Sequence, residues 1–112
     1  MLSNDCIFCK IIKGEIPSSK VYEDDKMLVF KDIEPKARVH LLAVAKTHFK
    51  LLEEANAEGR GLVDYMLFKI PEIARKNGCE NGYRLIINQG ADAGQTVFHL
   101  HIHILGGEEL PW

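Results

Sequence analysis

The sequence has no excess of charge of one sign and no long hydrophobic run. It contains 14 Lys and Arg residues against 16 Asp and Glu residues, which gives a formal net charge of −2. Such a balance gives no broad attraction to nucleic acid or anionic lipid, so an anionic ligand must be held locally. The longest apolar run, residues 41–45, is far too short to cross a bilayer. We therefore expect a soluble, cytoplasmic protein with neither a nucleic-acid nor a membrane partner.

Cysteine is also scarce, and the three cysteines form an odd set that argues against the disulfide framework of a secreted protein. Cys6 and Cys9 form a C-x-x-C pair, which indicates either half of a zinc site or a redox pair. A redox pair of the thioredoxin type follows a strand inside a βαβ unit, and nothing strand-like precedes Cys6. Zinc ligation is therefore the better interpretation of this pair.

The length of 112 residues predicts a single domain over residues 1–112. Hydrophobic periodicity predicts a short helix that ends at Gly14, one long helix over residues 51–76 with a bend at Pro71, and a helix end at Asn77-Gly78. The remaining segments predict five strands, in "KVYEDDKMLVFKDI" (a hairpin that turns at residues 23–26), "RVHLLAVA", "GYRLIIN" and "HLHIHILGG". Together these elements predict an α+β fold with a five-stranded antiparallel sheet, one long helix and one short helix.

Three histidines, His99, His101 and His103, alternate with apolar residues near the C-terminus. Alternate residues of a strand share a face, so the pattern predicts three imidazoles on one side of the sheet. A solvent-facing role would explain polar residues here but not three histidines. One metal ion bound by all three is disfavoured, because the outer two lie about 13 Å apart along a strand. We favour a third interpretation, in which His101 is a nucleophile and its neighbours orient it and donate a proton.

The loop before this strand reads "NQGADAGQTVFH". Gly90 and Gly94 permit backbone turns that expose N–H groups to an anion, and Gln95 and Thr96 add polar side chains. We therefore expect a phosphate cradle beside His101.

Two further histidines leave alternatives open. His40 is either a buried histidine bonded to a backbone carbonyl or a partner of the histidine cluster. His48 is either a surface residue or one ligand of a metal held by the C-x-x-C pair.

These features together resemble the histidine-triad (HIT) family, most closely its Hint branch of nucleoside phosphoramidases. The similarity rests on "CIFCKIIKGEIPSSKVYEDD", "VFKDIEPKARVHLLAVAKTH" and "NQGADAGQTVFHLHIHILGG". It implies a homodimer in which two sheets join into one continuous ten-stranded sheet. It also implies hydrolysis of nucleoside 5′-phosphoramidates, such as AMP joined to an amine, through a nucleotidyl-histidine intermediate that needs no cofactor for its chemistry.

The resemblance assigns a role to each matching residue. His101 would be the nucleophile, His103 would contact the phosphate and help protonate the leaving amine, and Asp32 would bind the ribose hydroxyls. His99 and His40 would complete the catalytic group. The phosphate would be surrounded by Asn88, Gly94, Gln95, Thr96 and the Val97 backbone, and the purine pocket would be walled by Ile7, Phe8, Phe30, Ile33 and Leu42. From the residues alone, each apolar wall residue is about equally well explained by core packing, and Asp32 by a turn before Glu34-Pro35.

The resemblance also implies a structural zinc ion bound by Cys6, Cys9, His48 and His99, a closed tetrahedral set. If His99 binds zinc it cannot also be a freely titrating relay, so its task would be to hold the histidine strand in place. Three other functions remain as alternatives. They are a dinucleoside polyphosphate hydrolase or nucleotidyl transferase, a non-catalytic nucleotide-binding module, and a zinc-dependent hydrolase whose histidines are catalytic ligands.

Overall fold

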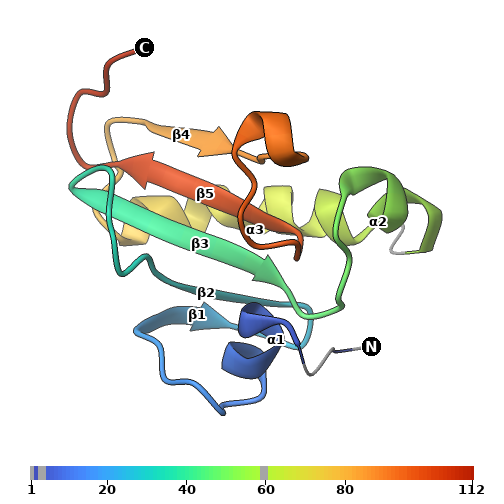
Figure 1. Cartoon of the computed structure of the whole chain (residues 1–112). Helices are drawn as coiled ribbons and strands as arrows, with labels where there is room; N and C mark the ends of the chain where they lie inside the picture. The colour runs from blue at the N-terminus through green and yellow to red at the C-terminus, as the bar shows by residue number, and fades with distance from the viewer. Residues whose placement is uncertain (1, 3–4, 59–60) are drawn as a thin grey trace.

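A single antiparallel sheet dominates the computed structural model, which describes residue 2, residues 5–58 and residues 61–112 (Figure 1). Its order is β1-β2-β3-β5-β4. The predicted α+β fold with five antiparallel strands and a hairpin before Met27 is confirmed. The strands are β1 (Lys20–Glu23), β2 (Met27–Lys31), β3 (Val39–Ala45), β4 (Tyr83–Ile86) and β5 (His101–Gly106).

The prediction of one long helix over residues 51–76 is wrong. That region holds two helices, α2 (Leu52–Glu58) and α3 (Leu62–Lys76). Gly61 precedes α3 with φ of +86°, a left-handed conformation that a right-handed helix cannot include. Residues 59–60 of the predicted helix lie outside the described residues. The predicted short helix is present as α1 (Ile7–Ile12), and a 3₁₀ turn, η1 (Ala91–Ala93), lies in the glycine-rich loop.

The long helix α3 ends where the sequence predicts. Pro71 lies inside it, and the left-handed Gly78 (φ +98°) follows its C-cap Asn77. In the described ranges, no helix has the length and apolar content needed to span a membrane.

Each face of the sheet has its own partner, because successive strand residues point to opposite sides. Met27, Val29, Leu41, Ala43, Ile102 and Ile104 point to one face and pack against α2 and α3 in the larger core. Leu28, Phe30, Leu42 and Val44 point to the other face and pack against α1. Figure 1 shows α3 behind the sheet and α1 beside β1 and β2.

This second face positions the candidate site. In the β3–β5 ladder Leu42 pairs with His103, Val44 with His101, and His40 with Leu105. Since α1 packs against the β2 and β3 side of the face, the histidines of β5 are left beside an open cavity.

Candidate active site and metal site

A cavity of about 690 Å³ lies on the α1 side of the sheet. The structure brings every predicted substrate-binding residue to its wall, together with His40, His101 and His103. The wall also includes residues that sequence reasoning did not single out, such as Lys36, Ile86 and Leu105. The predicted residues at the wall are Ile7, Phe8, Phe30, Asp32, Ile33, Leu42, Asn88, Gly94, Gln95, Thr96 and Val97.

The ring of His101 is buried and has one nitrogen fixed by the backbone. Its Nδ1 lies 2.7 Å from the carbonyl oxygen of His99. A carbonyl only accepts hydrogen bonds, so the proton of the neutral ring is on Nδ1, and Nε2 has a lone pair. The Phe8 ring packs edge-on against this imidazole, with the ring centroids 5.0 Å apart. The backbone carbonyl thus fixes the tautomer of the neutral ring, and Phe8 packs against the ring.

His103 and His40 form a second pair on the same face. His103 Nδ1 lies 2.9 Å from His40 Nε2, and the Lys36 backbone N–H donates to His40 Nδ1 at 3.0 Å. Asp32 Oδ2 lies 3.4 Å from His40 Nε2. Of the two alternatives for His40, the structure favours the partner of the histidine cluster, since its ring contacts His103 and no backbone carbonyl.

The environment keeps these rings uncharged near neutral pH. Burial lowers the pKa of His101, because the charged ring would lose hydration. Burial also lowers the pKa of His103 to about 4, and the neighbouring rings of His101 and His40 lower it further. Asp32 opposes both shifts but is outweighed.

The low pKa of His103 predicts a dependence of stability on pH. The unfolded chain takes up a proton on this ring near pH 6.5, whereas the folded protein does so only near pH 4. His103 therefore lowers the free energy of unfolding as the pH falls through that window. Urea denaturation at pH 7 and pH 5 should show a steeper loss for the wild type than for His103→Gln. Equal losses in the two proteins would contradict the prediction.

The glycine-rich loop has the predicted left-handed turns, with φ of +88° at Gly90 and +81° at Gly94. The Gln95 side chain, however, is buried and holds the loop itself. It accepts from the Gly90 N–H and donates to the carbonyls of Lys50 and Val97. Within the described chain the N–H groups of Thr96 and Val97 have no acceptor, so they are free to bind an anion. The backbone thus presents the N–H groups of this loop to the cavity, and the Gln95 side chain stabilises the loop.

Asp32 combines the two interpretations that the sequence left open. Its Oδ1 accepts from the Glu34 N–H at 2.8 Å, as a turn residue does. Its Oδ2 faces His40, and the residue lines the cavity.

The predicted apolar wall residues differ in burial. Phe8, Phe30 and Leu42 are buried core residues that also line the cavity, whereas Ile33 is 95% exposed and Ile7 48% exposed at its edge.

Cys6, Cys9, His48 and His99 meet beside α1, with one ligand atom of each within 4.8 Å of all the others. His99 Nδ1 lies 3.2 Å from Cys6 Sγ, 3.5 Å from Cys9 Sγ and 3.2 Å from His48 Nδ1. A tetrahedral zinc ion would separate its ligands by about 3.3 Å for two nitrogens and about 3.6 Å for nitrogen and sulfur. His99 Nε2 donates to the Ala45 carbonyl at 2.6 Å, which leaves Nδ1 free to bind a metal. The donor set therefore fits a structural zinc ion.

The expectation that His99 lies in the same strand as His101 and His103 is wrong. β5 begins at His101. The Ala45 N–H still donates to the Leu100 carbonyl, next to the last β3–β5 pair of Val44 with His101, but the Leu100 N–H donates to the carbonyl of Phe49, which lies beyond β3. The His99 side chain is thereby placed among the cysteines. Its backbone carbonyl contacts the His101 ring.

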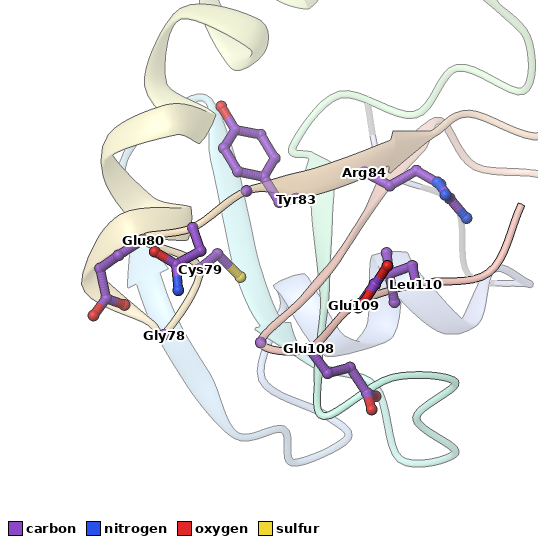
Figure 2. Close-up of a pocket in the computed structure, with 11 residues that line it drawn as sticks. Gly78, Cys79, Glu80, Tyr83, Arg84, Glu108, Glu109 and Leu110 are labelled. Atoms are coloured by element: carbon purple, nitrogen blue, oxygen red, sulfur yellow. The ribbon is translucent and has the colours of Figure 1, made fainter.

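A second cavity, of about 560 Å³, lies between the segment after α3 and the segment after β5 (Figure 2). Cys79, Glu80, Tyr83, Arg84 and Glu108 are among its lining residues. Burial raises the pKa of the Cys79 thiol, so this cysteine is a protonated, packed side chain. Among the described residues, metal-ligating groups gather at the cysteine cluster and at Asp32, His40 and His103, and neither cluster lies in this cavity.

Comparison with known proteins gives consistent results. The family model described as "Scavenger mRNA decapping enzyme C-term binding" matches residues 5–110. Protein HitA of Neisseria gonorrhoeae is 50% identical over 103 residues, which cover 92% of this chain and 96% of that protein. The "14 kDa zinc-binding protein" of Zea mays is 45% identical over 108 residues, which cover 95% of this chain and 84% of that protein.

Solved structures share the fold over nearly the whole chain. A histidine triad protein from Clostridium difficile superposes with a TM-score of 0.93 at 47% identity, covering 99% of this chain and 97% of that one. A HIT family hydrolase from Legionella pneumophila superposes with a TM-score of 0.89 at 40% identity, covering 96% of each chain.

Proposed function

The chain belongs to the histidine-triad family, and on that premise we propose that it is a hydrolase of purine nucleoside 5′-phosphoramidates. The observation that most supports this proposal is the state of His101. Its Nδ1–H donates a hydrogen bond to the His99 carbonyl, so the lone pair is on Nε2. The ring lines the cavity. A relative of similar fold bears the name of a hydrolase.

In the proposed reaction, Nε2 of His101 attacks the α-phosphorus of the bound nucleotide. A bond forms between this nitrogen and phosphorus, and the bond between phosphorus and the amine breaks. The leaving amine takes a proton from solvent water, and a nucleotidyl-histidine is produced. The free N–H groups of Thr96 and Val97 stabilise the negative charge on the phosphate oxygens. Water then attacks the same phosphorus, releases the nucleoside monophosphate and regenerates His101.

The other cavity residues would select the nucleoside. Asp32 Oδ2 would accept hydrogen bonds from the ribose hydroxyls, and the apolar wall that includes Phe8, Phe30 and Ile33 would contact the purine. The protein has a net charge of −2, so the whole molecule does not attract a phosphate. The phosphate would instead be bound by backbone N–H groups of the loop.

We further propose that a structural zinc ion is held by Cys6, Cys9, His48 and His99. The fit of the ligand distances to a tetrahedral site supports this, as does the zinc-binding name of the Zea mays relative. All four positions would be filled by protein ligands, so the ion would stabilise the fold and leave no open position for substrate.

Substrate comparison distinguishes this proposal from its main alternative. An adenosine 5′-phosphoramidate should be hydrolysed with a higher kcat/KM than a diadenosine polyphosphate, because the amine is the leaving group that the proposal names. The measurement is steady-state release of AMP from both substrates. A preference for the polyphosphate would favour a dinucleoside polyphosphate hydrolase, and binding of AMP without turnover of either substrate would favour a non-catalytic nucleotide-binding module.

Finally, we propose that two copies pair through β4 into a ten-stranded sheet. β4 lies at the edge of the sheet, where its outer backbone groups can pair with a second strand. Phe68 on α3 is 79% exposed, so it is an apolar side chain that a second copy could cover. Sedimentation should give a dimer, and Phe68→Glu should shift it toward the monomer. A monomeric wild type would contradict the proposal.

A further inference from the structure

We propose that the backbone amide of Lys36 is a positioning group that holds His103 neutral, with its single proton on Nε2. His103 would then donate a hydrogen bond from Nε2 to a phosphate oxygen, a role that needs no second proton on the ring. The inference deepens the proposed function and rests on it for the identity of the phosphate. The protonation pattern itself follows from the contacts among three residues.

The His40 side chain is buried, and its protonation state is set by the backbone of Lys36. The Lys36 N–H lies 3.0 Å from His40 Nδ1 and can only donate a hydrogen bond. His40 Nδ1 must therefore have a lone pair, because a proton there would face the amide hydrogen directly. The single proton of neutral His40 is then on Nε2.

The protonation state of His40 determines that of His103, because the two rings share a hydrogen bond. His40 Nε2 donates to His103 Nδ1 at 2.9 Å, and the Asp32 carboxylate lies beside the same nitrogen, with Oδ2 at 3.4 Å. The reverse direction would leave His40 with no proton on either nitrogen, an imidazolate, beside the Asp32 carboxylate. Since His103 Nδ1 accepts, the proton of neutral His103 is on Nε2.

The same contacts oppose a second proton on His103. That proton would have to bind Nδ1, where it would meet the Nε2 proton of His40, and the Lys36 amide prevents His40 from rearranging to accept it. The titratable and charged groups that face His103 are His40, His101, Asp32 and Lys36, and of these only Asp32 favours the charged ring. Lys36 therefore acts through its backbone and sets the state of two side chains.

The resemblance implied that His103 helps protonate the leaving amine, whereas the contacts assign it a different task. A neutral ring is a much weaker acid than an imidazolium, but it is a good hydrogen-bond donor. His103 would thus stabilise charge on the phosphate in the transition state and keep its proton.

Nitrogen NMR on the metal-loaded protein tests this directly. With ¹⁵N-labelled histidine, each ring nitrogen reports whether it bears a proton, and there are only five histidines to assign. At pH 7, with and without AMP, His40 and His103 should both show a protonated Nε2 and an unprotonated Nδ1. A protonated Nδ1 on His103 would overturn the proposal. The measurement requires no turnover, so its failure is distinct from failure of the proposed function.

Proline at position 36 tests the role of the amide. Lys36→Pro removes the N–H, so His40 and His103 should populate the other tautomer, and kcat should fall at least about tenfold with a smaller change in KM. Lys36→Ala keeps the amide and should retain the wild-type nitrogen spectrum. Ala37→Pro is the matched control for a proline in the same loop, and it should retain that spectrum too. Unchanged tautomers in a folded Lys36→Pro would overturn the proposal; if that variant unfolds, the wild-type spectrum decides.

Discussion

His101→Ala should lower the turnover of an adenosine 5′-phosphoramidate by at least about 10⁴-fold, because removing a covalent nucleophile leaves only binding and charge stabilisation. The neighbouring histidines cannot replace it. His99 Nδ1 faces the cysteines, and His103 Nδ1 is occupied by His40. The measurement is AMP release under single-turnover conditions.

Binding of AMP is the control for this variant. Phe8 is the wall residue that packs against the His101 ring, and the remaining wall and the loop N–H groups stay in place without it, so AMP affinity should change by no more than a few-fold. Loss of both binding and turnover would indicate a misfolded cavity and would be checked by thermal unfolding. Turnover that is retained in a folded His101→Ala would contradict the assignment of the nucleophile.

Removal of the metal should loosen the fold before it affects the chemistry. The first turn of α1 and its N-cap Cys6 would supply two ligands, and the same turn places Phe8 against His101, while the His99 carbonyl binds His101 Nδ1. Chelation should therefore lower the free energy of unfolding by at least about 3 kcal/mol and weaken AMP binding together with it. Denaturation with and without a chelator, followed by AMP titration, measures both effects.

Two cysteine variants test whether the effect of the chelator arises at the cluster of Cys6, Cys9, His48 and His99. Cys6→Ser should reduce the metal content and reproduce the effect of the chelator. Cys79→Ser should retain one metal ion per chain, since Cys79 lies in the second cavity away from the cluster. Loss of activity on chelation in a protein that stays equally stable and still binds AMP would instead favour a zinc-dependent hydrolase.

The sequence predicted the strands well because local patterns determine them. The hairpin before Met27, the buried strand around Leu42 and the left-handed glycines of the glycine-rich loop all depend on neighbours in the chain. The long helix was predicted without a break because Leu62, Met66 and Ile70 keep a helical period. Periodicity of side chains does not report the left-handed backbone at Gly61.

The sequence predicted which residues lie at the cavity and at the cysteine cluster, but it did not predict which groups they contact. Alternation placed His99 in a strand with His101, yet the β5 ladder starts at His101, and the N–H of residue 100 bonds to Phe49, which lies beyond β3. Gln95 looked like a phosphate ligand because it is polar and lies near Gly94, whereas its side chain satisfies three backbone groups of folded loops. Lys50 is distant in sequence from Gln95, as Phe49 is from residue 100, so spacing does not reveal these partners.

The central claim is that His101 forms a covalent bond to phosphorus, and trapping that adduct tests it most directly. The protein would be mixed with an adenosine 5′-phosphoramidate, quenched within milliseconds in alkaline denaturant, and digested for mass spectrometry. We predict an added AMP group on the peptide that contains His101, located on that residue by fragmentation and missing from His101→Ala. An AMP group on another residue, or rapid turnover with no adduct at any time, would contradict the account.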